Sequence, residues 1–151
     1  TQGARESTCM LAVIAMLAGK TLSKVKDDAH KLTGVPWSAR MSHDAYWKTV
    51  DKLRKRYNVT GVPTEYEWTS QIKLVVSGML PAGRKARRLP RGRGSITVFE
   101  PGRGAHRVAY EDGTVYDPGP RDTGAYTFSV WLKKNTTYEI ANICPEKRRK
   151  R

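Results

Sequence analysis

The chain has 151 residues and a mass of 17.0 kDa, which predicts one domain over residues 1–146 and a basic tail at 147–151. Its 38% hydrophobic and 28% charged residues argue against a wholly disordered chain, and no apolar run approaches the ~20 residues of a membrane-spanning helix. The 28 Lys and Arg residues against 14 Asp and Glu give a net charge of +14, which is typical of proteins that contact an anionic partner.

Much of the positive charge lies in two runs that contain no acidic residue. One is a predicted exposed loop over residues 83–94, and the other is the tail. The basic residues of the loop are Arg84, Lys85, Arg87, Arg88, Arg91 and Arg93, and those of the tail are Lys147, Arg148, Arg149, Lys150 and Arg151. We interpret the loop as a substrate- or anion-binding segment, and both runs as contacts for an acidic protein or nucleic acid.

The two cysteines, Cys9 and Cys144, are too few for a disulfide framework. Two free thiols in a reducing, cytoplasmic compartment are expected, with a single bridge as the alternative. Residues 10–18 match the length of a signal-peptide core, but Glu6 in the flank and the missing cleavage site favour a core helix. Neither cysteine has metal-binding spacing, so no zinc site and no cofactor is expected.

Three helices are predicted in the first 57 residues. A Ser-Thr pair at residues 7–8 and Gly19 predict the start and the end of the first, which is apolar on every side and therefore buried. Residues 21–32 have the apolar spacing of an amphipathic second helix. Ser42 is expected to cap a third helix that ends near Tyr57.

The pattern changes to β in the second half of the chain. Residues 59–63 are predicted to be extended, and residues 66–76 fit either a helix or a strand. Strands are predicted over residues 95–99, 106–110, 114–117, 126–132 and 137–143. Asp112-Gly113 between two alternating runs predicts a two-residue hairpin. The expected fold class is therefore α+β, with helices first and an antiparallel sheet second.

Cys9 is the candidate nucleophile because the prediction places it in the first turn of a buried helix. The positive end of the helix dipole favours a thiolate there. The alternative is that Cys9 is a small buried core residue.

His106 is the histidine best placed to act as the base. His30 and His43 lie on predicted helices, one beside acidic residues and the other at a positive helix end. His106 opens a predicted strand, and the hairpin register makes Asp117 its diagonal neighbour on the same face, at about 7–8 Å. Asp117 could then orient the imidazole. Asp122 lies beyond the hairpin and is not expected to take part.

The segments ESTCMLAVIAMLAG (residues 6–19) and GAHRVAYEDGTVYDPGP (residues 104–120) resemble the papain-like cysteine peptidases. The resemblance is closest to the compact branch that removes double-glycine leader peptides. It implies a papain-like fold, with Cys9 as nucleophile, His106 as base, Asp117 as orienting acid and Gln2 as oxyanion donor. Gln2 precedes Cys9 by one residue more than is usual in the family, so the backbone N–H of Cys9 is the alternative donor.

The expected function is an intracellular cysteine peptidase that hydrolyses peptide bonds through a Cys-His-Asp triad. A deamidase or amidase uses the same machinery, and the sequence leaves these reactions open. The alternative is a nucleic-acid- or host-factor-binding protein that keeps the scaffold and binds through the basic loop and tail. A small basic protein of this kind suggests a bacterial or phage source.

Overall fold

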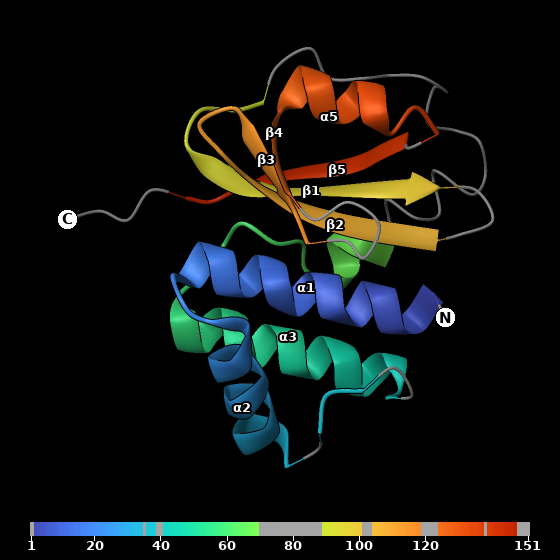
Figure 1. Ribbon diagram of the computed structural model, residues 1–151. Coiled ribbons are helices and arrows are strands. Elements are labelled where there is room, and N and C mark those ends of the chain that lie inside the picture. The colour runs from blue at the N-terminus through green and yellow to red at the C-terminus, as the bar shows by residue number, and fades with distance from the viewer. Residues whose placement is uncertain are drawn as a thin grey trace.

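The computed structural model describes residues 2–34, 36–38, 41–69, 89–100, 104–118, 124–137 and 139–147, and only the backbone of residues 2–8. In these residues helices α1, α2 and α3 precede a five-stranded antiparallel sheet. Figure 1 shows the sheet between these helices on one side and helix α5 on the other. The predicted α+β class, with helices first and sheet second, is confirmed.

Helix α1 (Gln2–Ala18) lies against the sheet and forms the centre of the helical core. Residues 9–15 are all buried, because strand β2 covers one side and helices α2 and α3 pack on the others. Gly19 ends the helix with a φ of 67°. The predicted start at residues 7–8 was wrong: the helix begins at Gln2, so Cys9 lies in the third turn rather than the first.

Helices α2 (Leu22–Thr33) and α3 (His43–Tyr57) agree with the sequence prediction. The Thr21 hydroxyl caps α2 and the Ser42 hydroxyl caps α3, each accepting a backbone N–H three residues later. The two helices are joined by a buried carboxylate. Asp28 accepts hydrogen bonds from the Tyr57 hydroxyl of α3 and from Lys24 one turn earlier on α2.

Residues 59–69 connect the helices to the described sheet without forming a strand. Residues 59–63, predicted to be extended, form no strand and pair with no described strand. Residues 65–69 are helical, capped by Thr64 and Glu67, whose side chains bond to each other's backbone N–H groups. The rest of the ambiguous segment, and residues 83–88 of the predicted loop, lie outside the described residues.

The strands are β1 (Arg93–Glu100), β2 (Gly104–Glu111), β3 (Thr114–Asp117), β4 (Gly124–Thr127) and β5 (Glu139–Pro145). Their order across the sheet is β4-β3-β2-β1-β5. Asp112 and Gly113 have φ values of 48° and 82°, as a two-residue turn requires. Glu111 pairs with Thr114, so the predicted hairpin register is confirmed.

Helix α5 (Phe128–Lys134) replaces most of the strand predicted over residues 126–132. Thr127 ends β4 and caps the helix by accepting the backbone N–H of Val130. Phe128 and Trp131, three residues apart, lie on one helical face and pack on the sheet. The aromatic and β-branched residues of this segment fit a strand equally well, which is why local propensity predicted one.

The described residues form two hydrophobic cores on opposite faces of the sheet. One core lies among α1, α2 and α3, and we call this part of the molecule the helical half. The other core lies between the sheet and α5, and we call this part the sheet half. A connection between the halves is made by Glu146, whose carboxylate accepts the backbone N–H groups of Thr60 and Gly61. Beside it, the Cys144 thiol donates to the carbonyl of Thr60 at 3.5 Å.

Candidate active site

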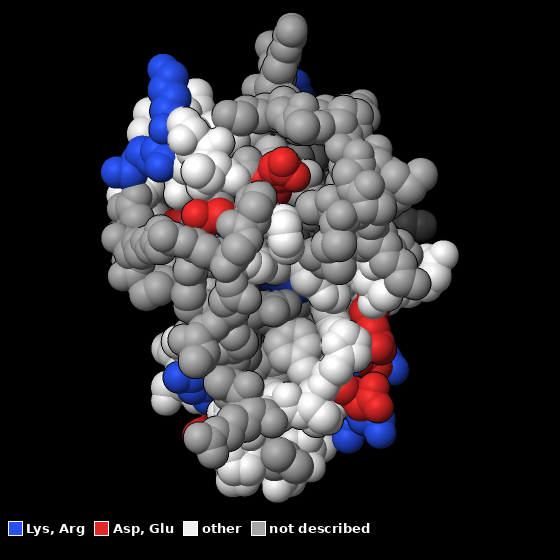
Figure 2. Space-filling view, turned by 90° about the vertical axis from the view of Figure 1, so that its right-hand side faces the viewer, with Lys and Arg blue, Asp and Glu red and all other residues white. Residues whose placement is uncertain are grey.

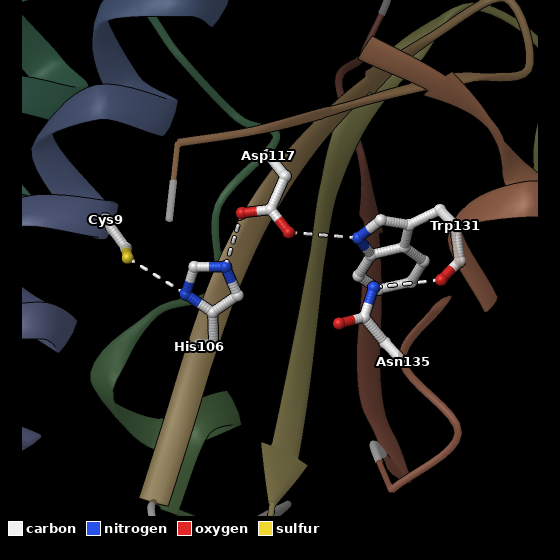
Figure 3. Close-up of polar contacts among 5 residues, drawn as sticks. All are labelled: Cys9, His106, Asp117, Trp131 and Asn135. Carbon is white, nitrogen blue, oxygen red and sulfur yellow. Dashed lines mark hydrogen bonds and ion pairs between the residues drawn. The ribbon is translucent and has the colours of Figure 1, made fainter. Parts of the chain in front are cut away.

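Cys9, His106 and Asp117 form a continuous line of polar contacts (Figure 3). The Cys9 Sγ lies 3.0 Å from His106 Nδ1, and His106 Nε2 lies 2.7 Å from Asp117 Oδ1. The three residues are 2%, 3% and 6% exposed. The structure therefore brings together the three residues that the sequence predicted as a triad, although 97 residues separate the thiol from the imidazole along the chain.

The meeting point lies where α1 passes the beginning of β2. Ala109 of β2 is buried against the helical core, with Ala105 at its edge, and these small side chains allow α1 to approach the strand closely. Pairing of β2 with β3 covers residues 109–111, so His106 lies beyond the paired stretch. At this point Cys9 of the helical half contacts the imidazole of His106, which belongs to the sheet half.

The His106 ring presents Nδ1 to the thiol and Nε2 to the carboxylate. This is the reverse of the serine peptidase triad, in which Nε2 faces the nucleophile. Burial acts to lower the pKa of His106, but the hydrogen bonds to Asp117 and Cys9 outweigh it and raise this pKa to about 9. The site therefore holds a protonated imidazole beside the sulfur near neutral pH.

The second oxygen of Asp117 contacts helix α5. The indole Nε1 of Trp131 donates to Asp117 Oδ2 at 3.1 Å, and Trp131 is 0% exposed. The side-chain amide of Asn135 in turn donates to the Trp131 carbonyl at 2.9 Å, at the end of the helix. Each carboxylate oxygen of Asp117 thus receives a donor from a different element, β2 or α5 (Figure 3).

Arg107 follows His106 but points to the opposite face of β2, into the helical core. It is fully buried. Its guanidinium lies 4.6 Å from the Trp68 ring centroid and 5.6 Å from that of Trp47, and Nη1 lies 3.9 Å from the sulfur of Met10. The contact with Met10 ties the strand that carries the base to the helix that carries the thiol, and the cation–π contact with Trp47 ties it to α3.

Sequence reasoning found neither Trp131 nor Arg107 as part of the site. The signal for Trp131 was available, because a buried indole N–H must find an acceptor and Thr127 begins a helix with Phe128 and Trp131 on one face. For Arg107 the signal was its position in a strand of otherwise buried residues. Trp47, Trp68 and Trp131 are all buried.

The remaining catalytic predictions concern the oxyanion donors. Gln2 begins α1, about 10 Å along the helix axis from Cys9, and its side chain lies outside the described structure. Its role stays a prediction. The backbone N–H of Cys9 lies inside α1, where amides bond to carbonyls four residues earlier. This N–H is therefore not the available donor that the sequence suggested.

The described residues of the two basic runs lie away from the triad. Arg91 precedes β1 and Arg93 begins it, whereas His106 pairs with Val98 farther along that strand. Lys147 follows β5. Arg84, Lys85, Arg87, Arg88 and residues 148–151 lie outside the described part of the chain, as does Asp122. Of the other histidines, His30 is exposed and His43 lies 3.3 Å from Glu65.

Figure 2 looks onto the end of the molecule where α1 begins. The surface there is hollowed between the sheet half above and the helical half below, and acidic side chains among the described residues lie on both halves. The described part of this face is therefore not a uniformly basic surface.

The described residues contain no group of three or more His, Cys, Asp or Glu side chains that could hold a metal ion. Within the same residues, no helix is long and apolar enough to cross a membrane. Both cysteines are free thiols. Comparison with known proteins found no matching family model, no matching curated protein and no matching solved structure.

Proposed function

We propose that this chain is a papain-like cysteine peptidase that hydrolyses peptide bonds through Cys9, His106 and Asp117. The observation that carries the proposal is the buried line from the Cys9 sulfur through the imidazole to the Asp117 carboxylate, at 3.0 Å and 2.7 Å. A thiol, a ring nitrogen and an orienting carboxylate at these separations are the parts that acyl transfer to sulfur requires.

The reaction begins with His106 protonated and Cys9 as the thiolate. The sulfur attacks the carbonyl carbon and forms a C–S bond, and the proton on His106 Nδ1 passes to the departing amine as the C–N bond breaks. The imidazole then takes a proton from water, which attacks the thioester and releases the acid. The C–S bond breaks as the acid leaves, which regenerates the thiolate beside the ring that now carries the proton taken from water, so the atoms and charges balance.

A deamidase would follow the same steps with ammonia as the leaving group, and the triad alone favours neither reaction. Peptide hydrolysis is proposed because the sequence resemblance is to peptidases. The two reactions have different products, since hydrolysis shortens a peptide and deamidation keeps its length.

The test is digestion of a mixed peptide library near neutral pH, read by mass spectrometry, with iodoacetamide labelling of each thiol measured in parallel. Wild type and Cys144→Ser should cleave the library, whereas Cys9→Ser should leave it intact. Cys144 is the matched control because burial raises the pKa of its thiol to about 11, so it should alkylate slowly.

Two results would contradict the proposal. An uncleaved library combined with equal labelling of Cys9 and Cys144 would exclude thiol catalysis. Conversion of side-chain amides to acids without cleavage, lost in Cys9→Ser, would replace the peptidase with a deamidase.

The second candidate function is nucleic-acid binding, favoured by where the two basic runs join the sheet. Gly94 of β1 pairs with Pro145 of β5, and Glu146 N donates to the Arg93 carbonyl at 2.8 Å. Arg91, Arg93 and Lys147 therefore meet at one end of the sheet, which lies away from the triad. Both runs leave the described structure there, and arginine-rich segments without acids suit phosphate.

Binding to a fluorescent single-stranded oligonucleotide tests this second candidate. Changing Arg91, Arg93 and Lys147 to Gln should weaken binding and reduce the slope of log affinity against log salt by about 2. The matched control changes three exposed lysines of the helical half, Lys20, Lys26 and Lys31, to Gln. Equal binding by the two triple variants, or no binding at low salt, would exclude this function.

A further inference from the structure

We infer that Trp131 is a positioning residue that keeps Asp117 ionised and thereby confines the mobile proton of the triad to His106 Nδ1. The inference rests on the proposed function and assigns a part in it to helix α5. It starts from the contact between the indole Nε1 and Asp117 Oδ2 at 3.1 Å, made by a side chain that is 0% exposed.

An indole N–H is a donor and never an acceptor. Oδ2 of Asp117 is therefore the acceptor, and it accepts more strongly when the carboxylate is ionised than when that oxygen carries a proton. The other oxygen, Oδ1, faces His106 Nε2 at 2.7 Å. A proton on Oδ1 would have to displace the one on Nε2. With a donor at each oxygen, the charged form of the carboxylate is favoured.

An ionised Asp117 fixes which nitrogen of His106 keeps its proton. The carboxylate holds the proton on Nε2 whether the ring is charged or neutral, so every transfer uses Nδ1, which lies 3.0 Å from the Cys9 sulfur. The neutral ring then presents a free electron pair at Nδ1, where the water that cleaves the thioester must be activated. Trp131 acts on this step without touching the substrate.

The surroundings of Trp131 hold the indole in place for this role. Phe128 stacks on it, with ring centroids 6.3 Å apart and an interplanar angle of 21°. Asn135 donates to its backbone carbonyl at 2.9 Å. Asp117 is contacted from β2 by His106 and from α5 by Trp131, and Cys9 of α1 lies beyond the imidazole (Figure 3).

The test compares wild type with Trp131→Phe, which keeps an aromatic ring and removes the N–H. Nitrogen-15 spectra of the His106 ring well above pH 9 report the neutral form, since the pKa of His106 is about 9. The proton should reside on Nε2 in wild type and be shared between the two nitrogens in the variant. Labelling of Cys9 by iodoacetamide at neutral pH should be slower in the variant, on the order of tenfold.

Phe128→Leu is the packing control, because it loosens α5 without removing the donor to Asp117. It should lower the melting temperature and leave both the tautomer and the rate of Cys9 labelling unchanged. Site-specific 3-benzothienylalanine at position 131 replaces the N–H with sulfur at nearly constant shape, and it should reproduce the Trp131→Phe result even if the Phe variant folds poorly.

An unchanged tautomer in both position-131 variants would overturn the inference. So would an equal shift in Phe128→Leu, because the effect would then come from packing. These spectra do not depend on peptide cleavage, so a wild type that holds the Nε2 proton but cleaves nothing would contradict the proposed function instead.

Discussion

Asp117 connects the site to two different elements through its two oxygens. Nearly all of its surface is buried, and His106 of β2 and Trp131 of α5 supply the donors. A buried carboxylate with two donors is favourable only while both contacts persist. A change that keeps the shape of this side chain is therefore the one that tests the chemistry of the site separately from the fold.

Asp117→Asn should lower turnover about 10²–10⁴-fold with the fold retained, because the amide matches the shape of the acid but can stabilise the wrong imidazole tautomer. Hydrolysis rates and the circular dichroism spectrum measure the two effects. Asp122→Asn is the matched control and should keep nearly normal turnover. A dead Asp122 variant beside an active Asp117 variant would contradict the triad.

The raised pKa of His106 predicts the behaviour of the site at alkaline pH. A folded-state pKa of about 9, against an ordinary value of 6.5, means that the charged ring stabilises the fold fully below about 6.5. That contribution is lost as the pH rises through about 9. The melting temperature of wild type should fall over this window more steeply than that of His106→Gln, and parallel curves would refute the prediction.

The packing of α2 on α3 depends on the hydrogen bond from Tyr57 to the buried Asp28. This bond and the one from Lys24 lower the pKa of Asp28. A lowered pKa stabilises the fold above the ordinary carboxyl value, and the contribution is lost as the pH falls through the folded-state value.

Tyr57→Phe should therefore cost more stability near pH 7 than near pH 3, so the difference in melting temperature between these two conditions should be smaller in the variant than in wild type. Thermal melts at both pH values measure it. Tyr66→Phe is the control, because Tyr66 is 81% exposed and should melt as wild type does. An equal loss for Tyr57→Phe at both pH values would show that the hydroxyl acts independently of the carboxylate.

Elements with a local signal were predictable from the sequence, and the others were not. Thr21 and Ser42 cap their helices, and Asp112-Gly113 closes its hairpin, through contacts within a few residues. The early start of α1 was missed because residues 2–6 have no apolar face, and α5 was missed because its residues fit a strand. The triad followed from the hairpin register and a family resemblance. A buried indole predicts that Trp131 finds an acceptor, but that the acceptor is Asp117 depends on packing between distant segments.

The whole molecule consists of two halves whose cores lie on opposite faces of one sheet. The thiol belongs to the helical half, and the imidazole and carboxylate belong to the sheet half. The halves also meet at Glu146, which follows β5 and binds the backbone of residues 60–61. That contact lies at the opposite end of the sheet from His106.

Glu146→Ala should destabilise the fold by about 1–3 kcal/mol, because two backbone N–H groups lose a charged acceptor. Urea unfolding measures the change, and exposed Glu111→Ala serves as the control with little effect. Iodoacetamide labelling of Cys9 in the folded variant should match wild type, since the change is remote from the triad. Slower iodoacetamide labelling of Cys9 in a variant of unchanged stability would contradict the separation of the Glu146 contact from the triad.

The positions of the two cysteines determine how the protein responds to oxidation. Cys144 pairs with Ser95 on β1, whereas His106, which contacts Cys9, pairs with Val98, roughly 10 Å farther along the strand. No other cysteine exists in the chain, so a sulfenic acid formed at Cys9 has no internal thiol with which to condense.

Peroxide should therefore inactivate wild type and Cys144→Ser at equal rates, with an added thiol such as dithiothreitol restoring both. A protective intramolecular disulfide seen in wild type alone would contradict this expectation. The enzyme that we propose thus depends on the reducing agents of its surroundings to keep its nucleophile intact.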